Sequence, residues 1–157
     1  MPIYHKLGKI PPKRHTQFRK PDGGLYYEQL FGTIGFDGMS ALMYHVHRPT
    51  MIREVLSETD VNPKIAVSKS IKPRLLKGFE LTPEDDFLAS LKVLLSNADI
   101  HIGLAAPRQS LRSYFYKNAD ADEMLFVHEG SGTLYTMYGE LNFKYGDYII
   151  IPRGTVY

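Results

Sequence analysis

The sequence predicts a mainly β protein that folds as a small double-sheet, jelly-roll barrel. Outside one segment, β-branched and aromatic side chains dominate the apolar residues, with 11 Tyr and 8 Phe but no Trp, and such residues favour strands. Within residues 124–151, four short apolar runs are separated by glycine-containing turns, which is typical of antiparallel β structure. A helix start signal occurs once, at Thr82.

The first half of the chain is expected to hold an arm and strands. Residues 1–24 are predicted to be an extended arm, because prolines interrupt its basic residues, and the arm ends in a turn at residues 21–24. Residues 25–31 and 41–47 are predicted strands, separated by a loop that contains Gly32, Gly35 and Gly38. Residues 64–76 alternate weakly between apolar and polar and are predicted to form a strand pair.

One short helix and one hairpin are predicted next. Thr82 can cap a helix, Pro83 fits its first position, and the acids that follow suit its first turn. The helix could run to Leu95 or stop near Ser90, and the short version is favoured because residues 93–102 read as two strands joined by a turn at 96–99.

The clearest strands follow, and their close spacing between glycine turns predicts an antiparallel meander. They are residues 124–127, 133–138, 141–145 and 148–151, separated by turns at 130–132, 139–140 and 146–147.

Charge and composition narrow the function classes. The net charge is +2, from 19 basic and 17 acidic residues, and no nucleic-acid-binding module follows the basic arm. No apolar stretch reaches the roughly 18 residues of a membrane helix, and no secretion signal opens the chain. Because cysteine is absent, we expect a cytoplasmic location. From the charge and the lack of a membrane helix, we expect neither nucleic acid nor membrane as a partner.

Two spacings in the last third of the chain are specific. A glutamate precedes a glycine by seven positions, and a Gly-Asp pair precedes a Pro-Arg-Gly triplet after a gap of four residues. The first two glycines lie where strands reverse and can take φ > 0. The aspartate can hydrogen-bond its own turn, and the proline and last glycine end a strand. These structural positions are Glu123, Gly130, Gly146, Asp147, Pro152 and Gly154.

The two spacings resemble the signature motifs of cupins, which are small double-sheet β barrels. More narrowly, residues 114–155 look like the N-terminal cupin half of homogentisate 1,2-dioxygenase. The Leu-Tyr-Tyr-Glu-Gln-Leu run at 25–30 also resembles that family's first strand. The resemblance runs, with gaps, from about residue 25 to the end, and it covers well under half of a family member.

This resemblance implies a function. The family opens the aromatic ring of homogentisate with O2 at a single Fe(II), in tyrosine and phenylalanine breakdown. Its iron ligands and catalytic His lie in the C-terminal cupin half, so none can be carried onto this sequence. Residues 25–157 would then form a structural N-terminal cupin that helps pack a homo-oligomer. The implied partners are the C-terminal cupin half, other copies and, in the complete enzyme, a small aromatic substrate.

No metal and no catalytic residue are predicted for this chain itself. A metal-binding cupin places His-x-His three or four residues before the motif glutamate, and another His three residues after the last motif glycine. The residues in these slots are Lys117 and Ala119, or Tyr116 and Asn118, and then Tyr157. Only Glu123 remains, whereas a first-row metal needs about three protein ligands. Glu123 is therefore interpreted as making a salt bridge or a backbone hydrogen bond.

Other candidate ligands have structural explanations. His45 and His47 would share one face of their strand, but no third ligand lies nearby in the sequence, and a ligand role stays open. The acidic residues 84–86 and 120–123 could do acid–base work or hold Ca²⁺. The first cluster, however, suits a helix N-terminus, and the second suits a turn that enters a strand.

Two further expectations concern the chain as a whole. Because a cupin strand should follow the bend at 152–154, we expect an unfinished barrel with an exposed edge, which would aggregate, pair with a second copy or borrow residues 1–24. The alternative function is a stand-alone, non-catalytic cupin that binds a small ligand or a partner protein.

Overall fold

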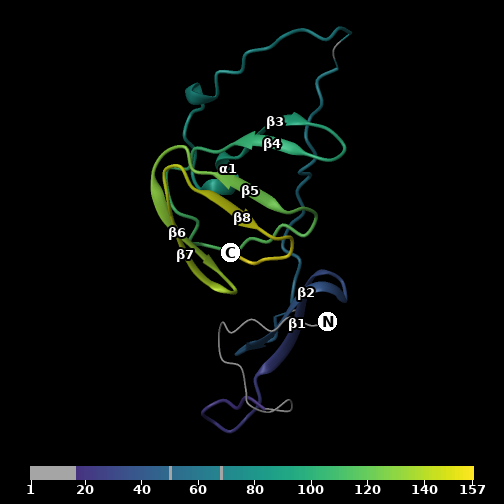
Figure 1. Cartoon of the computed structure of the whole chain (residues 1–157), viewed down its shortest axis with the longest axis vertical. Coiled ribbons are helices and arrows are strands. Elements are labelled where there is room, and N and C mark those ends of the chain that lie inside the picture. The colour runs from purple at the N-terminus through teal and green to yellow at the C-terminus, as the bar shows by residue number, and fades with distance from the viewer. Residues whose placement is uncertain (1–16, 50, 68) are drawn as a thin grey trace. The chain divides into compact units, whose positions relative to one another are not determined.

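The fold is mainly β, as the sequence predicts. The computed structural model describes residues 17–49, 51–67 and 69–157, and the chain divides into two compact units, Met1–Leu56 and Ser57–Tyr157. The described residues form four two-stranded antiparallel sheets, one α-helix of four residues and no closed barrel (Figure 1). This architecture is that of an incomplete, cupin-like β sandwich. Most of the predicted arm, residues 1–16, lies outside the described residues, and the single domain predicted at 25–157 stays a prediction.

The first unit is built on one hairpin. Strand β1 (Tyr27–Ile34) pairs with β2 (Asp37–His45), from Tyr27 opposite His45 to Ile34 opposite Asp37. The predicted glycine loop is too long, because only Gly35 and Phe36 form the turn. A Cβ on Gly32 would collide with the carbonyl oxygen of Gly35, so this glycine lets the hairpin close tightly.

The end of the predicted arm packs on this hairpin. The ring of Phe18 lies 4.6 Å from the ring of Tyr44, centroid to centroid, and Arg19 pairs with Leu25. The predicted turn at 21–24 is confirmed: the Gly24 N–H donates to Asp22 Oδ1 at 2.9 Å, and Gly23 has φ +83°.

The strand pair predicted at 64–76 is wrong. Within 51–67 and 69–77 the structure has no strand, and Ile65, Val67 and Ile71 are exposed. Pro63 and Pro73 remove two backbone donors, and no strand among the described residues pairs with the segment. Weak alternation alone therefore did not produce β structure here.

The predicted short helix exists, but its cap differs. Helix α1 (Phe87–Ser90) begins after Asp86, whose Oδ1 accepts from the Ala89 N–H at 3.0 Å. Thr82 does not cap it, because Glu84 is held in a parallel bridge with Pro107 and cannot turn helical. No helix among the described residues is long and apolar enough to span a membrane. A single 3-10 turn, Gly78–Glu80, precedes α1 in this part of the chain.

The hairpin that follows is confirmed. Strand β3 (Lys92–Ser96) pairs with β4 (His101–Leu104). The side chain of Asn97 shapes their turn, because its Oδ1 accepts from the backbone N–H groups of Asp99 and Ile100.

The last four strands exist as predicted, but they do not form a meander. Strand β5 (Glu123–Phe126) pairs with β8 (Tyr148–Ile151), and β6 (Ser131–Thr136) pairs with β7 (Gly139–Lys144) (Figure 1). The β6–β7 hairpin is thus nested inside the β5–β8 pair. The backbone of Val127 explains the nesting. Its N–H donates to the Asp147 carbonyl and its carbonyl accepts from the Gly146 N–H, so the pairing of β5 with the β8 side continues past Phe126. Strand β6 therefore pairs with β7 instead.

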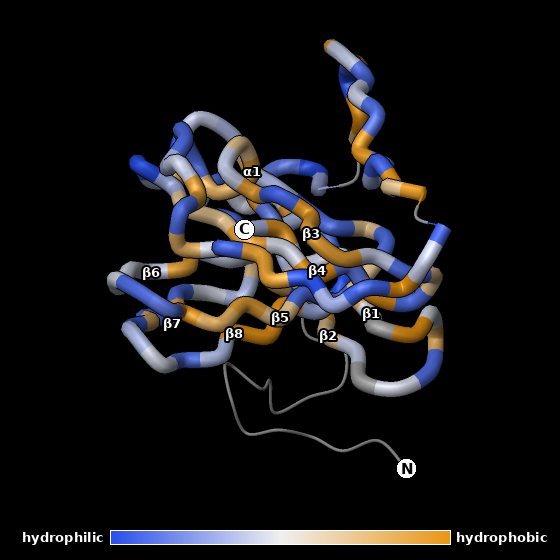
Figure 2. Tube along the Cα trace, turned by 90° about the horizontal axis from the view of Figure 1, so that it is seen from above, coloured by the Kyte–Doolittle hydropathy of each residue, from blue (hydrophilic) through white to orange (hydrophobic). Residues whose placement is uncertain are grey.

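The β5–β8 ribbon separates an inner from an outer face. Glu123 and Leu125 share the inner face with Ile149 and Ile151, and Ile151 is only 3% exposed. The outer face is formed by Met124, Phe126, Tyr148 and Ile150, which are 68%, 49%, 65% and 68% exposed. Hydrophobic residues therefore occupy both faces of this ribbon, and Figure 2 shows β5 and β8 as largely apolar strands.

We predict that the Asp86 carboxylate makes stability depend on pH. Its pKa is lowered by the Ala89 N–H and then by the Tyr114 hydroxyl, which donates to Oδ2 at 2.8 Å. Asp86→Asn keeps an acceptor but loses the charge, so it should lower the free energy of unfolding above about pH 5. The deficit should shrink as the pH falls below about 4, because the unfolded chain is protonated first, and it should vanish once the pH has fallen through the lowered pKa of the folded carboxylate.

Urea unfolding at several pH values measures this effect. Asp99→Asn, which alters an exposed aspartate in the β3–β4 turn, is the matched control and should change little at any pH. A deficit in Asp86→Asn that is the same at pH 3 and pH 7 would contradict the role of the charge.

Candidate functional site

The site is assembled where the last residues of the chain cross two other segments. Tyr116 and Tyr157 exchange backbone hydrogen bonds of 2.8 and 3.0 Å, and Lys117 pairs with Val156. On the other side of the same segment, the Met137 N–H donates to the Val156 carbonyl at 3.0 Å. Residues 155–157 therefore lie between residues 116–118 and the end of β6, and they act as a short strand between two neighbours.

Glu123, the first residue of β5, is held by two side chains. The Tyr157 hydroxyl donates to Glu123 Oε2 at 2.8 Å, and Asn118 Nδ2 donates to Oε1 at 3.3 Å. All three side chains are half-buried. The ring of Tyr116 meets that of Tyr157 edge to face at 5.4 Å. We call these four residues, Tyr116, Asn118, Glu123 and Tyr157, the Glu123 cluster.

The cluster joins four residues that the resemblance to cupin motifs matched to metal-ligand slots. The sequence left two spacings open for the first pair, and the structure brings together Tyr116 and Asn118. Lys117 is exposed, and its backbone forms an isolated antiparallel bridge with Val156. The expected partner of Glu123 was a cation or a backbone group. The structure gives it a phenol and an amide instead, because those side chains fill the ligand slots.

Asn118 is itself fixed by the turn that leads into β5. Its Oδ1 accepts from the backbone N–H groups of Asp120 and Ala121, both at 3.0 Å. The amide can therefore present only Nδ2 to Glu123. This arrangement orients the amide and makes Asn118 a donor to the carboxylate.

The electrostatics of the cluster favour a protonated phenol. Burial raises the pKa of Tyr157 well above its usual value, and the hydrogen bond to Glu123 raises it further. Burial also raises the pKa of Tyr116, with smaller contributions from the charges of Glu123 and Asp120. Tyr157 therefore stays a hydrogen-bond donor throughout the physiological range.

The residues of the cluster do not fit a catalytic iron. Fe(II) in oxygen-activating enzymes takes imidazole and carboxylate ligands and needs open positions. Here one carboxylate is present, its two oxygens are engaged by Tyr157 and Asn118, and the tyrosine is protonated. Among the described residues, no group of three or more His, Asp or Glu side chains is placed to hold a metal ion.

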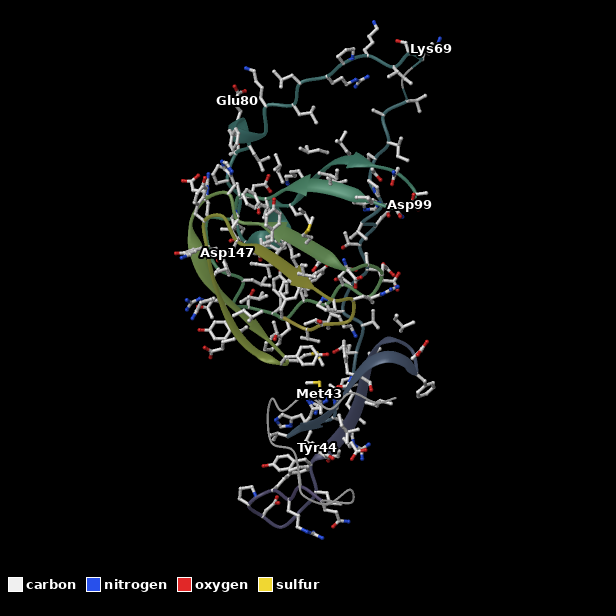
Figure 3. The ribbon with its side chains drawn as sticks, viewed as in Figure 1. Met43, Tyr44, Lys69, Glu80, Asp99 and Asp147 are labelled. Atoms are coloured by element: carbon white, nitrogen blue, oxygen red, sulfur yellow. The ribbon has the colours of Figure 1, made fainter. Side chains whose placement is uncertain are left out.

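The other motif residues shape the turns at the two ends of the β5–β8 pair. Gly130, Gly146 and Gly154 have φ of +87°, +88° and +82°, a conformation that favours glycine. Asp147, at the turn before β8 (Figure 3), accepts from the Lys144 N–H at 2.8 Å through Oδ2. Pro152 follows β8 and its carbonyl accepts from Thr155.

The other candidate ligands, the acidic clusters and the two histidines, make local structural contacts. Asp122 accepts from the Arg153 N–H at 2.8 Å, which ties the acidic turn to the bend after β8. Glu84 forms an ion pair with Lys92 at 3.0 Å. His45 ends β2 and lies 2.8 Å from Gln29 Oε1 through Nε2, whereas His47 lies in a bend beyond the strand. The two histidines thus do not share a strand face as the sequence suggested.

The fold and the Glu123 cluster define a cupin-like β protein whose ligand positions hold a carboxylate and its hydrogen-bond partners. No family model matches the chain, and no solved structure matches it. The chain is 38% identical over 159 aligned residues to a protein of Saccharolobus solfataricus named "Putative dioxygenase". The alignment covers 100% of this chain and 41% of that protein, so the chain spans less than half the length of this relative.

We predict that the Tyr157 hydroxyl stabilises the fold. Tyr157→Phe should lower the free energy of unfolding at pH 7 by about 1–2 kcal/mol, because a half-buried carboxylate loses a donor. Since the pKa of folded Tyr157 is raised above its unfolded value, this stabilisation should persist up to about pH 10 and fall at higher pH.

Chemical denaturation between pH 7 and pH 11 provides the measurement. The control is Tyr148→Phe, at an exposed position on the outer face of β8, which should change the free energy by less than about 0.5 kcal/mol. Equal effects of the two substitutions would show that the Glu123 cluster contributes nothing specific.

Proposed function

We propose that this chain is the N-terminal part of an Fe(II)-dependent, ring-cleaving dioxygenase similar to homogentisate 1,2-dioxygenase. The observation that carries the proposal is the similarity, over the whole chain, to a longer protein named as a dioxygenase. The cupin-like fold and the motif spacings around Glu123 support it. The substrate proposed for the complete protein is homogentisate, in tyrosine and phenylalanine breakdown in the cytoplasm.

In this proposal the chain has a structural role. The Glu123 cluster holds its carboxylate with Tyr157 and Asn118 and leaves no ligand set for iron. Iron would be held by a C-terminal cupin half, and there it would supply the site at which substrate and O2 meet. The contribution of the present residues is a rigid β scaffold, because the cluster fixes residues 155–157 against β5.

The outer face of the β5–β8 ribbon is the proposed contact for a second copy. Met124, Phe126, Tyr148 and Ile150 form a contiguous apolar face on a two-stranded ribbon. Apolar side chains gathered in this way typically mark an interface. We therefore propose that the chain forms a homo-oligomer through this face.

We predict that the 157-residue chain has no ring-cleaving activity. Homogentisate, Fe(II) and O2 should give no ring-opened product with the chain alone, since the described residues provide no iron ligand set. The chain joined to the downstream part of its gene should consume O2 with homogentisate and retain iron. Elemental analysis and oxygen-electrode measurements check both expectations.

Two outcomes would contradict the proposal. Product formation by the 157-residue chain would show that it has its own active site. A gene that ends at Tyr157, with a stable and inactive product, would favour the stand-alone binding cupin. Gentisate, which lacks the extra methylene of the homogentisate side chain, serves as the control substrate for the longer protein.

We predict that the outer face drives self-association. The double substitution Met124→Thr/Ile150→Thr removes apolar surface from this face and keeps residues suited to strands. It should shift the chain toward the monomer in size-exclusion chromatography with light scattering, while the free energy of unfolding changes by less than about 0.5 kcal/mol per residue.

Ile100→Thr is the matched control, because Ile100 is 60% exposed but lies in the β3–β4 turn. It should leave the association unchanged. If the unsubstituted chain is monomeric, the outer face is not a contact between copies. If association disappears only when the downstream part is attached, that part covers the face instead.

A further inference from the structure

A pocket lies between the β6–β7 hairpin and the end of β8. Its volume is about 200 Å³. Most of its lining is apolar or hydroxyl-bearing, and the residues that matter here are Leu134, Thr136, Leu141, Ile151, Pro152 and Thr155. Ile151 lies opposite Glu123 in the β5–β8 ladder. Ile150, from the outer face, also lines the pocket, so the pocket lies at the end of β8 and is bordered by both Ile150 and Ile151.

Thr155 lines this pocket and carries an unused hydroxyl. The residue is 3% exposed, and its Oγ1 is buried without a hydrogen-bond partner among the described residues. Its backbone N–H is satisfied by the Pro152 carbonyl at 3.1 Å, so the side chain alone is unpaired. Buried hydroxyls are nearly always hydrogen-bonded in proteins, and an unpaired one beside a pocket points to a partner that enters the pocket.

The other lining groups restrict what that partner can be. Thr136 Oγ1 is already engaged, because it lies 2.9 Å from the Gly139 carbonyl and 3.0 Å from the Tyr138 N–H. The ionisable acid of the lining is Glu140, and no lysine, arginine or histidine among the described residues lines the pocket. Burial raises the pKa of Tyr138, another lining residue, to about 12. These surroundings disfavour an anion and favour a neutral molecule.

The size of the pocket restricts the ligand further. A dry apolar cavity of about 150 Å³ is known to accept benzene, so about 200 Å³ has room for one six-membered ring and a small substituent. The apolar side chains would contact the ring, and Thr155 would exchange a hydrogen bond with the substituent. A ring that carries a single hydroxyl group meets both requirements.

We propose that this pocket is a binding site for a small neutral phenol, held by apolar contacts to its ring and by a hydrogen bond between its hydroxyl and Thr155 Oγ1. The site is separate from the Glu123 cluster and needs neither iron nor the ring-cleaving activity proposed above. A carboxylate-bearing phenol such as homogentisate is not its ligand, because Glu140 would repel the anion.

The test is an NMR titration of the 157-residue chain, with labelled methyl groups, against phenol, toluene and 4-hydroxybenzoate. Phenol should bind saturably and shift the methyl signals of Leu134, Leu141, Ile151 and Thr155. Toluene should bind about threefold to tenfold more weakly, which is the range expected for one hydrogen bond. 4-Hydroxybenzoate should not shift these signals.

Two substitutions assign the hydrogen bond. Thr155→Val should weaken phenol by the same threefold to tenfold and leave toluene unchanged. Thr133→Val is the matched control: this β6 threonine bonds Asn142 and does not line the pocket, so its phenol affinity should equal that of the wild type.

The proposal is overturned if phenol shifts no pocket signals, if it binds no better than toluene, or if Thr155→Val and Thr133→Val bind it equally. Should Thr155→Val fail to fold, the comparison of phenol with toluene in the unsubstituted chain still decides the question. Loss of phenol binding says nothing about the dioxygenase proposal, which the activity of the longer protein tests by itself.

Discussion

A half-buried carboxylate that must be satisfied without a cation constrains the whole C-terminal region. Glu123 receives donors from a residue five positions earlier and from another 34 positions later. Both donors lie on segments that pair with each other through Tyr116 and Tyr157. The ladder between those segments, the bend after β8 and the start of β5 are therefore mutually dependent. In a barrel with a metal, the ion would join these same segments; here hydrogen bonds join them.

Local patterns were sufficient to predict most elements, apart from the strand pair at 64–76, but not their partners. The runs that became β5 to β8 were evident, because turn glycines such as Gly130 and Gly146 bound short apolar segments. Their nesting was not evident, since the spacing of turns does not reveal that Val127 bonds residues 146 and 147 rather than β6. The helix cap failed for a similar reason. Glu84 forms a parallel β-bridge with Pro107, which is distant in the sequence and which no local signal identifies.

The candidate site was predictable in outline. The resemblance to the cupin motifs matched Glu123 and Tyr157 to ligand slots before their contact was known. The choice between the pair Lys117 and Ala119 and the pair Tyr116 and Asn118 depended on strand register, which a one-residue shift reverses. Thr155 was missed altogether, because a threonine beside a bend is ordinary in sequence and becomes unusual only when its hydroxyl proves buried and unpaired.

The exposed stretch that replaced the predicted strand pair has a consequence for handling the protein. Residues 51–67 and 69–77 are almost entirely solvent-accessible and contain Arg53, Lys64 and Lys72. Such backbone fits readily into a protease active site, so nicking concentrates in segments of this kind. Trypsin would act near the division between the two compact units at Leu56 and Ser57. Resistance to digestion at Lys64 and Lys72 would thus report any partner that covers Ile65, Val67 and Ile71.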